Sequence, residues 1–383
     1  MHRSTRWWIL VLSAASSVVL SGCSATTSSK LAAGVPISTT APAKSSTTTA
    51  THQGTTTSTT ATTTATHQGT TTTSTTTTMD PYRQRSAAFA SRLPIPRALV
   101  PFGNPAVAGE GTWTSAGRLV DGVPAVYETK LVPPGGTQPA GIAWMDTNLL
   151  SARLYSGSRS PGGGPYRYTA SIQPAQAASL VTAFNGGFIM NAAGGGYYTE
   201  GRMIDPLALG AASLVIYSNG SINVGAWGSD VKMAPNVVSV RQNLVPLVAA
   251  GQPTPQAASP DWQAWGATCG ATSCVGPGLE RQWRSAIGVT ANGALVYVTG
   301  PALDPLQLAQ ILVQAGVVRG MQLDINPYWT VLVTYNPSTP GGLASPSNGS
   351  KLLPATVQGP MTFFEAWWAR DFITMSERPA STS

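Results

Sequence analysis

The chain has 383 residues, of which 42% are hydrophobic and only 10% are charged. Its 22 basic and 15 acidic residues give a formal net charge of +7, but Lys and Arg form no cluster and no nucleic-acid-binding motif is present, which argues against DNA or RNA as a partner. All three histidines, His2, His52 and His67, precede residue 79. The rest of the chain therefore cannot use Ser-His-Asp or Cys-His catalysis or a His-ligated zinc centre.

Residues 1–22 are predicted to be a bacterial export signal. Arg3 and Arg6 precede an apolar stretch, and the segment ends in Leu20-Ser21-Gly22-Cys23, the pattern processed in lipoproteins. Cleavage there would leave Cys23 as an acylated first residue; the alternative is an ordinary signal peptide with a coincidental Cys. Because several acyl chains bind a membrane more firmly than one, we expect a lipid anchor at the extracytoplasmic face of the cell membrane.

Residues 23–78 are predicted to hold the lipidated Cys23 and a disordered spacer. Thr, Ser and Ala dominate it, and one ten-residue sequence occurs at 48–57 and again at 63–72. Such a composition buries too little apolar surface to offset the entropy of ordering a backbone. The spacer is either O-glycosylated or an unmodified tether, and the sequence leaves both open.

Residues 79–383 are predicted to form the folded domain. These 305 residues suffice for a real hydrophobic core, and none of their stretches is long and apolar enough to span a bilayer. The leader and spacer contain four of the basic residues and no acidic ones, which leaves 18 basic and 15 acidic residues, a net charge of +3. Much of the basic character thus lies outside the domain.

The first half of this domain is predicted to be rich in strands. We expect a short helix at 86–90, strands at 125–127 and 141–154, a short helix at 174–179 and a central strand at 180–184. The Gly-rich stretch 193–198 lacks the preceding strand and the Gly-Lys-Ser/Thr sequence of a phosphate loop. We interpret it as a mobile flap.

Two Asn-Gly dipeptides predict hairpins in the second half. Asn219-Gly220 lies between apolar runs, as does Asn292-Gly293. Asp304-Pro305 then caps a helix with one apolar face, which Gly316 ends, and a strand over 317–323 follows. The predicted fold class is α+β, with strand-rich mixed sheets and a few packed helices.

Two further features have alternative explanations. Cys269 and Cys274 predict a disulfide in an exported domain, since a metal site would need two more soft ligands that the chain does not offer. Aromatic residues at i, i+4 spacings predict a helix near the C-terminus, which either packs into the core or stacks on sugars. They are Phe363, Phe364, Trp367, Trp368 and Phe372.

Polar residues interrupt three apolar strands of the predicted domain. Asn185 follows the central strand and is continued by Gly186-Gly187, Arg284 precedes a strand, and Asp324 follows another. The Asn-Gly-Gly sequence is either a hairpin turn or a place where a ligand approaches the backbone. Because polar groups at buried strand ends are costly unless they share a ligand, we expect Asn185, Arg284 and Asp324 to converge on one pocket.

Taken in order, these elements resemble the phosphodiester glycosidase family over roughly residues 180–330. That family has an Asn-Gly-Gly-Phe element, then an Arg before an apolar-Gly strand, then a Leu-Asp-Gly-Gly turn. Here the third element matches as Leu323-Asp324 and continues as Ile325-Asn326-Pro327-Tyr328-Trp329. The resemblance implies a phosphodiester-glycosidase-like fold and hydrolysis of sugar-1-phosphate diesters in cell-envelope glycans. The sequence itself indicates no cofactor and no metal site.

Such a reaction needs a carboxylate beside the sugar ring and a cation at the departing phosphate. The resemblance assigns these roles to Asp324 and Arg284, and Asn185 would orient the substrate. Glu200, with Arg202 or Asp205, would supply a second carboxylate or a phosphate contact; Gly186, Gly187, Asn326 and Tyr328 complete the expected substrate site.

Two alternatives to this assignment stay open. In the first, Arg284 and Asp324 pair in a purely structural salt bridge. In the second, the protein is a catalytically inactive envelope glycan-binding lipoprotein of the same fold, in which Tyr328 and Trp329 stack on sugar and Pro327 removes a backbone donor.

Overall fold

The computed structural model describes residues 91–259, 265–266 and 281–379, all within the unit Thr75–Ser383. The helix expected at 86–90, the lipidation site Cys23 and the pair Cys269 and Cys274 lie outside the described residues. Within the described part of the chain, none of the helices combines the length and apolar character of a membrane span.

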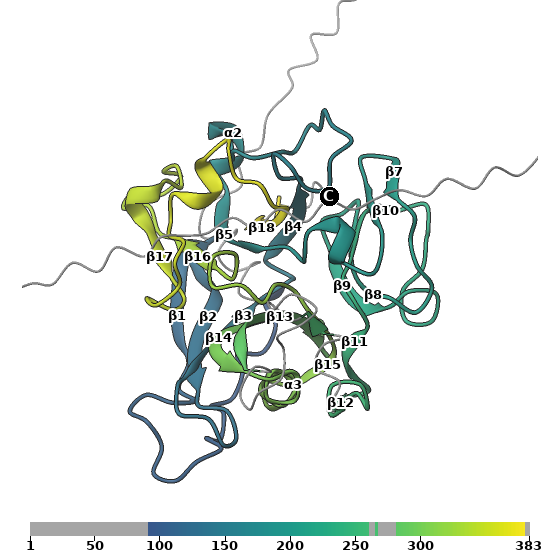
Figure 1. The fold of residues 1–383 in the computed structure, drawn as a ribbon. Helices are drawn as coiled ribbons and strands as arrows, with labels where there is room; N and C mark the ends of the chain where they lie inside the picture. Colours follow the sequence, from purple (N-terminus) through teal and green to yellow (C-terminus); the bar gives the residue numbers. More distant parts are fainter. Residues whose placement is uncertain (1–90, 260–264, 267–280, 380–383) are drawn as a thin grey trace, which may run out of the picture. The chain divides into compact units, whose positions relative to one another are not determined.

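The largest sheet has eight strands, all paired antiparallel (Figure 1). In sheet order they are β1 (Thr114–Val120), β2 (Val123–Leu131), β3 (Ala140–Met145), β14 (Leu295–Leu303), β13 (Gln282–Thr290), β15 (Val317–Gln322), β11 (Pro246–Ala249) and β12 (Gln252–Pro253).

Two five-stranded antiparallel sheets accompany it. One has the order β17 (Gly349–Lys351), β16 (Leu332–Tyr335), β5 (Leu180–Asn185), β18 (Phe372–Glu377) and β4 (Leu150–Tyr155). The other has the order β7 (Arg202–Asp205), β6 (Tyr197–Thr199), β10 (Val237–Gln242), β8 (Ala212–Tyr217) and β9 (Ile222–Ala226). The predicted α+β class, strand-rich with few helices, is confirmed.

The helices in the described part of the chain are short. They are α2 (Pro174–Ala177), α3 (Pro305–Gln314) and the 3-10 helices η1 (Met190–Ala192), η3 (Pro346–Asn348) and η4 (Thr362–Phe364). In α3 the Asp304 side chain accepts from the Gln307 N–H at 2.7 Å, and the Gln307 side chain accepts from the Asp304 N–H at 3.1 Å. This capping box, with Gly316 at φ +85° beyond the helix, confirms the predicted helix and its ends.

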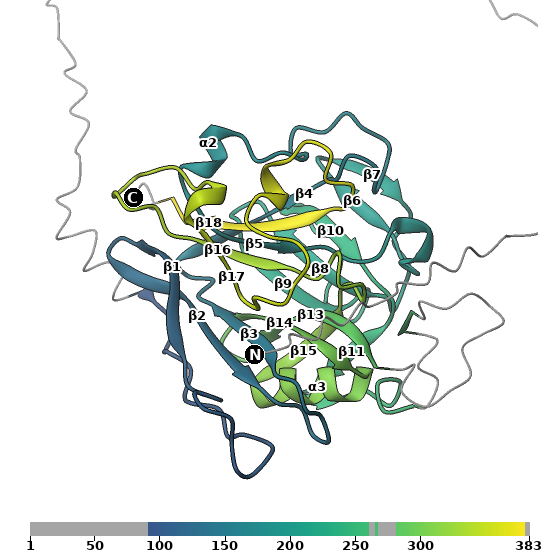
Figure 2. The ribbon, with the colours of Figure 1, turned by 60° about the vertical axis from the view of Figure 1, so that its left-hand side comes forward.

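The large sheet lies between two hydrophobic layers. Val296 and Val298 of β14 pack with the apolar face of α3, while Leu295 and Tyr297, which alternate with them, pack toward the five-stranded sheets. Figures 1 and 2 show α3 beside β13, β14 and β15, with β5 and β18 on the other side of these strands. Alternate side chains of β14 thus contribute to the hydrophobic core on both faces of the large sheet.

Both predicted hairpins are present. Gly220, at φ +76°, turns β8 into β9, and Gly293, at φ +89°, turns β13 into β14. Only glycine adopts such a backbone conformation without strain, which is why Asn-Gly was a reliable signal.

The single strand expected at 141–154 is wrong, because a turn divides it into β3 and β4. Asp146 accepts the N–H of Asn148 at 2.9 Å through one carboxylate oxygen and the N–H of Leu93 at 2.7 Å through the other. These bonds stabilise the turn, and the two strands join different sheets.

The expectation of a mobile flap at 193–198 is also wrong. Ala193 is fully buried and its carbonyl accepts the Leu244 N–H at 2.6 Å, while the Gly196 N–H donates to Gln242 Oε1 at 2.7 Å. A Cβ on Gly196 would lie 2.2 Å from the Pro206 carbonyl oxygen. The glycines allow close packing rather than movement.

The aromatic residues near the C-terminus do not share a helix. Only Thr362–Phe364 is helical, as η4, and Phe372 begins β18. Phe363, Trp368 and Phe372 are fully buried, which confirms core packing for these three, whereas Trp367 is 54% exposed.

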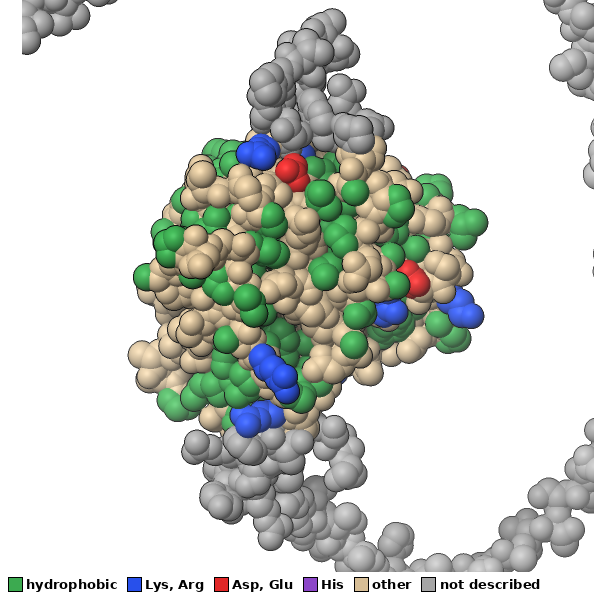
Figure 3. Space-filling view, turned by 90° about the horizontal axis from the view of Figure 1, so that it is seen from below, with side chains coloured by type: hydrophobic (Ala, Val, Ile, Leu, Met, Phe, Trp, Pro, Cys, Tyr) green, Lys and Arg blue, Asp and Glu red, His purple; other side chains and the backbone are tan. Residues whose placement is uncertain are grey.

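Charge is sparse on the surface as well as in the sequence. Figure 3 shows one face of the molecule, where the few Lys, Arg, Asp and Glu side chains are scattered among hydrophobic and uncharged ones. This face therefore offers no extended field of one sign to a polyanion such as a nucleic acid.

Candidate active site where strand ends meet

Strand ends from all three sheets meet inside the domain. Asn185 ends β5 opposite Phe372, the first residue of β18, and Gln322 ends β15 opposite Ala286 of β13. The Asn185 Nδ2 donates to Ser285 Oγ at 3.0 Å, which links a five-stranded sheet to the large one. The third sheet contributes Asn243, the residue after β10. Its Nδ2 donates to the carbonyls of Gln322 at 3.0 Å and Leu323 at 2.9 Å.

The amide group of Asn185 makes all of its hydrogen bonds within the protein. Its Oδ1 accepts from Tyr297 Oη at 2.7 Å and from the Val331 N–H at 3.1 Å. Its Nδ2 donates to Ser285 Oγ and to the Gly186 carbonyl at 2.8 Å. Two acceptor sites and two donors are the full capacity of an Asn amide. The side chain connects the sheets, and its role toward a substrate stays a prediction.

The glycines after Asn185 permit close packing rather than a hairpin turn. A Cβ on Gly186 would lie 1.9 Å from Asp371 Oδ2, and one on Gly187 would lie 2.7 Å from Asn243 Oδ1. The Gly186 N–H donates to the Asp371 carbonyl at 2.9 Å. Other groups approach the backbone closely at these glycines, as expected of Gly-Gly. They are side chains of the protein itself rather than a ligand.

Arg284 points to the opposite face of β13 from Ser285. Its Nε donates to the Leu303 carbonyl at 2.8 Å and its Nη1 to Gln322 Oε1 at 2.7 Å. The side chain is fully buried. Because neighbouring side chains on a strand point to opposite faces, Ser285 faces Asn185 while Arg284 does not. The structure thus brings Asn185 and Asp324 together through Ser285 and places the guanidinium of Arg284 elsewhere.

Asp324 is paired with Arg370, a residue for which the sequence gave no expectation. Arg370 Nη2 donates to Asp324 Oδ2 at 2.5 Å and to the Gly187 carbonyl at 2.9 Å. The other carboxylate oxygen accepts the N–H groups of Ile325 at 2.8 Å and Asn326 at 3.2 Å. The side chains of Asp324 and Arg370 are 5% and 11% exposed, so little water screens the pair.

Burial raises the pKa of the Asp324 carboxyl from 3.8 to about 6. The positive charge of Arg370 opposes this rise most strongly, and the N–H groups of Ile325 and Asn326 and the charge of Arg241 oppose it further. A carboxyl group with a pKa near 6 changes protonation close to neutral pH. Such a pKa is typical of catalytic acids and bases.

A buried donor of Arg370, its Nε, is not used by any described residue. An unsatisfied buried donor costs about 1–3 kcal/mol. A ligand oxygen at this nitrogen would remove that cost, and a guanidinium edge suits the oxygens of a phosphate.

One aromatic ring, that of Trp329, lies against this ion pair, and further rings pack beside it. Asn326 Oδ1 accepts the Tyr328 N–H at 2.9 Å and so closes the turn that carries Tyr328 and Trp329. The guanidinium carbon of Arg370 lies 5.2 Å from the centre of the Trp329 ring. Tyr328 is 50% exposed and Trp367 is 54% exposed, which leaves two ring surfaces available to a sugar.

A second, fully buried ion pair supports the first. Arg241 Nε donates to Asp371 Oδ2 at 2.8 Å and Nη2 donates to Oδ1 at 3.1 Å. The Arg241 guanidinium also donates to the carbonyls of Phe188 and Gln242. Because Asp371 follows Arg370 in the chain, this pair fixes the backbone from which Arg370 reaches Asp324.

The structure places Glu200, Arg202 and Asp205 in the β6–β7 hairpin rather than beside Asp324. Glu200 accepts the N–H groups of Arg167 at 3.0 Å and Tyr168 at 2.9 Å. Arg202 donates to the carbonyls of Gly163 at 3.0 Å and Pro165 at 2.8 Å. Glu200 and Arg202 therefore hold the loop at 163–168, and the catalytic role of Glu200 stays a prediction.

Across residues 91–259, 265–266 and 281–379, no group of three or more His, Cys, Asp or Glu is placed to hold an ion. The candidate site consists of one carboxylate, one guanidinium, backbone N–H groups and aromatic rings.

The chain matches no family model and no curated protein. Among solved structures it is similar to the zebrafish N-acetylglucosamine-1-phosphodiester alpha-N-acetylglucosaminidase catalytic domain auto-inhibited by its pro-peptide, with a TM-score of 0.41, 17% identity, and coverage of 70% of this chain and 88% of that chain. It is also similar to a hypothetical protein from Synechocystis, with a TM-score of 0.34, 12% identity, and coverage of 67% and 63%. Both similarities are distant, and family membership stays a prediction.

Gly186→Ala should destabilise the domain because the new methyl group must displace the Asp371 carboxylate from Arg241. We expect the free energy of unfolding to fall by about 1–3 kcal/mol, as for other overpacked interiors. Denaturant titration measures it. The matched control is Gly359→Ala, where a Cβ meets nothing within 4 Å. Equal losses in the two variants would contradict this account of the Gly-Gly sequence.

Arg370→Gln should raise the pKa of Asp324 above about 6, because it removes the main influence that opposes burial. Carbon-13 NMR of the Asp carboxyl groups measures the titration. Arg319→Gln should leave it unchanged, because the Arg319 guanidinium binds Asn223 and Val224 instead. The native pKa exceeds the unfolded value, so the stability that Asp324 contributes is present below pH 3.8 and is lost as pH rises through about 6. A native titration near pH 4 would refute the burial argument.

Proposed function

We propose that this protein hydrolyses sugar-1-phosphate diesters of cell-envelope glycans, with Asp324 and Arg370 at its catalytic centre. The observation that supports the proposal best is the Asp324–Arg370 contact at 2.5 Å beside an Arg370 Nε that has no partner among the described residues. In this proposal Arg370 takes the role that the sequence pattern assigned to Arg284.

The chemistry requires opposite charges on the two sides of one bond. The bond between the anomeric carbon and the phosphate oxygen breaks, positive charge develops on the sugar ring, and a phosphate monoester leaves with the bonding electrons. Water then forms the new bond to the anomeric carbon and releases a proton to the solvent or the departing phosphate.

Asp324, once ionised, stabilises the positive charge that develops on the ring. The Arg370 guanidinium binds a phosphate oxygen through its unpartnered Nε. Since a phosphate monoester is a good leaving group, the site needs no strong general acid. This matches a centre with one carboxyl group that is ionised above about pH 6.

Aromatic rings would hold the sugar. Tyr328 and Trp367 expose about half of their surface, and Trp329 lies between Arg370 and the buried Trp368, with its ring centre 5.0 Å from that of Trp368. Sugar rings stack on such faces while their hydroxyl groups remain free for hydrogen bonds.

A catalytically inactive glycan-binding protein is the second candidate. It is favoured by the full engagement of the Asp324 carboxylate, whose two oxygens already accept three hydrogen bonds from Ile325, Asn326 and Arg370. In this case the exposed rings bind sugar and no bond is cleaved.

We also propose that the protein acts at the outer face of the cell membrane, because Leu20-Ser21-Gly22-Cys23 matches the lipoprotein-processing pattern. Mass spectrometry of the mature N-terminus should show an acylated Cys23. Cys23→Ser should abolish acylation and leave the protein unprocessed or outside the membrane fraction. An unmodified N-terminus that begins elsewhere would contradict the anchor.

Asp324→Asn should lower kcat for a small diester such as methyl glucosyl phosphate by about 10²-fold or more, since it removes a charge used in the transition state. Arg370→Gln should raise KM and lower kcat together, because phosphate is bound in both the ground and transition states. Arg319→Gln, whose guanidinium instead binds the Val224 carbonyl at 2.8 Å, is the control.

Parent protein that binds glucose-1-phosphate but cleaves no diester would support the glycan-binding candidate and contradict the hydrolase. Turnover that survives in both Asp324→Asn and Arg370→Gln would contradict the assigned centre even if the protein is a hydrolase.

A further inference from the structure

A cavity of about 870 Å³ lies away from the candidate active site. It is lined by β4 residues Ser151–Leu154 at the edge of one five-stranded sheet, and by the β8–β9 turn and β10 of the other. Neither Asp324 nor Arg370 lines it. Its volume is within the range of about 300–1,000 Å³ that is typical of ligand sites.

The charges in this cavity are mostly positive. Its lining contains three arginines, Arg153, Arg167 and Arg378, and one acidic residue, Glu200, for a formal net charge of +2. Glu200 already accepts two backbone N–H groups, at 2.9 and 3.0 Å. Arg378 donates to the carbonyls of Thr147 and Leu150, each at 2.8 Å. Glu200 is thus engaged with backbone N–H groups rather than with the guanidinium of Arg153 or Arg167, and the cavity keeps its net positive charge.

Arg153 and Arg167 hold their guanidinium groups against one ring. Their guanidinium carbons lie 4.0 Å and 5.3 Å from the centre of the Tyr168 ring. Neither side chain makes a hydrogen bond or ion pair with any described residue. Stacking on an aromatic ring restrains a guanidinium while leaving its N–H edge available to an acceptor.

Other contacts keep this arrangement in place. Tyr168 packs edge-on against Tyr155, with ring centres 5.7 Å apart, and Glu200 fixes the backbone of Arg167 and Tyr168. Arg167 is thus presented by a braced loop and Arg153 by strand β4, with both guanidinium groups held against the same Tyr168 ring. Such preorganisation lowers the entropy lost on binding.

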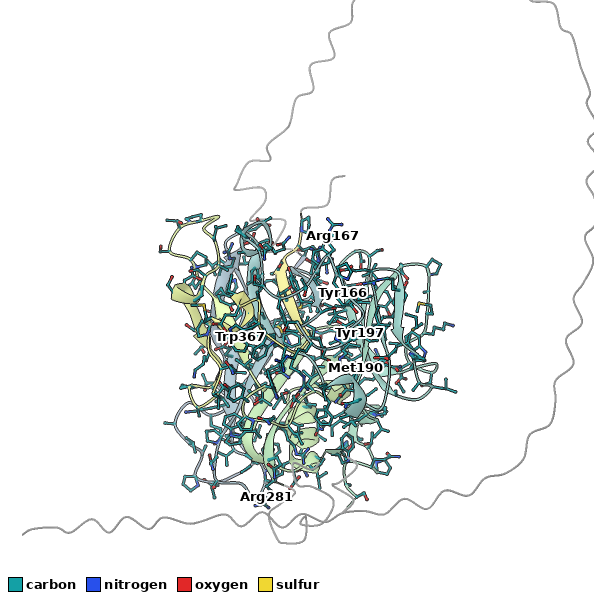
Figure 4. The ribbon with its side chains drawn as sticks, turned by 45° about the horizontal axis from the view of Figure 1, so that its top comes forward. Tyr166, Arg167, Met190, Tyr197, Arg281 and Trp367 are labelled. Carbon is teal, nitrogen blue, oxygen red and sulfur yellow. The ribbon has the colours of Figure 1, made fainter. Side chains whose placement is uncertain are left out.

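We propose that this cavity binds an anionic saccharide, with a carboxylate or phosphate group held by Arg153 and Arg167. Ser218, Ser239 and Thr199 line the same cavity. The Thr199 and Ser239 hydroxyls lie 3.0 Å apart and share one hydrogen bond, which leaves the Ser218 hydroxyl to bind a sugar hydroxyl. Two available cations suit one or two anionic groups and not the dense phosphates of a nucleic acid. The lining of this cavity contains none of Asp324, Arg370 and Trp367, so it is a second site; Figure 4 labels Arg167 and Trp367 at different places on the molecule.

Isothermal titration calorimetry on the full-length protein tests the proposal. The probes are trigalacturonate for carboxylates, glucose-6-phosphate for phosphate, and neutral maltotriose. We expect at least one anionic probe to bind, with an affinity that falls as salt increases, and maltotriose not to bind. The anionic probe that binds identifies the charged group.

The double change Arg153→Gln with Arg167→Gln should weaken that binding about tenfold or more, because two charge-assisted contacts are lost. Arg159→Gln removes an exposed arginine that does not line the cavity and should have no effect. Circular dichroism melts confirm that the variants fold. Hydrolysis of a small diester should be unchanged in the double variant, and Asp324→Asn should keep the binding, so the two sites can fail independently.

Several results would overturn the proposal. They are absence of binding by either anionic probe, equal binding of maltotriose, and equal weakening by Arg159→Gln. Binding of a short single-stranded DNA as tight as that of the saccharide would also overturn it, because it would assign the cavity to a polyanion of another class.

Discussion

Strand ends that meet inside a protein leave N–H and C=O groups without ladder partners, and these groups must be satisfied by something other than water. In this domain side chains do so. Asn185 accepts the Val331 N–H, Asn243 accepts the Phe188 N–H and donates to two carbonyls, and the Ser285 hydroxyl contacts the Asp324 backbone. These few polar residues join the three sheets.

This requirement explains why polar residues at strand ends are not all functional. Asn185 and Arg284 have the residue types and positions of ligand-binding groups, yet their hydrogen bonds lie within the fold. Removing one partner of the buried Arg241–Asp371 pair would cost about 3–5 kcal/mol. Arg370 differs from all of them, since it meets a carboxylate and still has an unused donor. Arg118 has the same two features beside Glu377, but that carboxylate is 36% exposed, whereas the Asp324 side chain is 5% exposed.

Local signals in the sequence predicted much of the fold. The Asn-Gly turns, the Asp304 capping box and the central strand at 180–184 depend on neighbouring residues, and the structure confirms them. The turn at Asp146 and the packed glycines at 194–196 depend on partners far along the chain, such as Leu93 and Gln242. Local patterns could not reveal those contacts.

The candidate site was predicted only in part, for the same reason. Asp324 is correctly placed at a buried strand end, but its partner Arg370 lies 46 residues further along the chain, just before a strand of a different sheet. The Arg370-Asp371 sequence within an aromatic stretch was a usable signal, because two charges in an otherwise apolar region require partners. The direction in which Arg284 points was not predicted, because a shift of one residue along β13 moves a side chain to the opposite face of the sheet.

A crystal structure of the protein soaked with glucose-1-phosphate tests the central claim most directly. The account predicts a phosphate oxygen about 3 Å from Arg370 Nε, with the sugar ring beside Asp324 and an aromatic face of Tyr328 or Trp367. A ligand bound only elsewhere, with Arg370 still paired to Asp324 and its Nε unchanged, would contradict it.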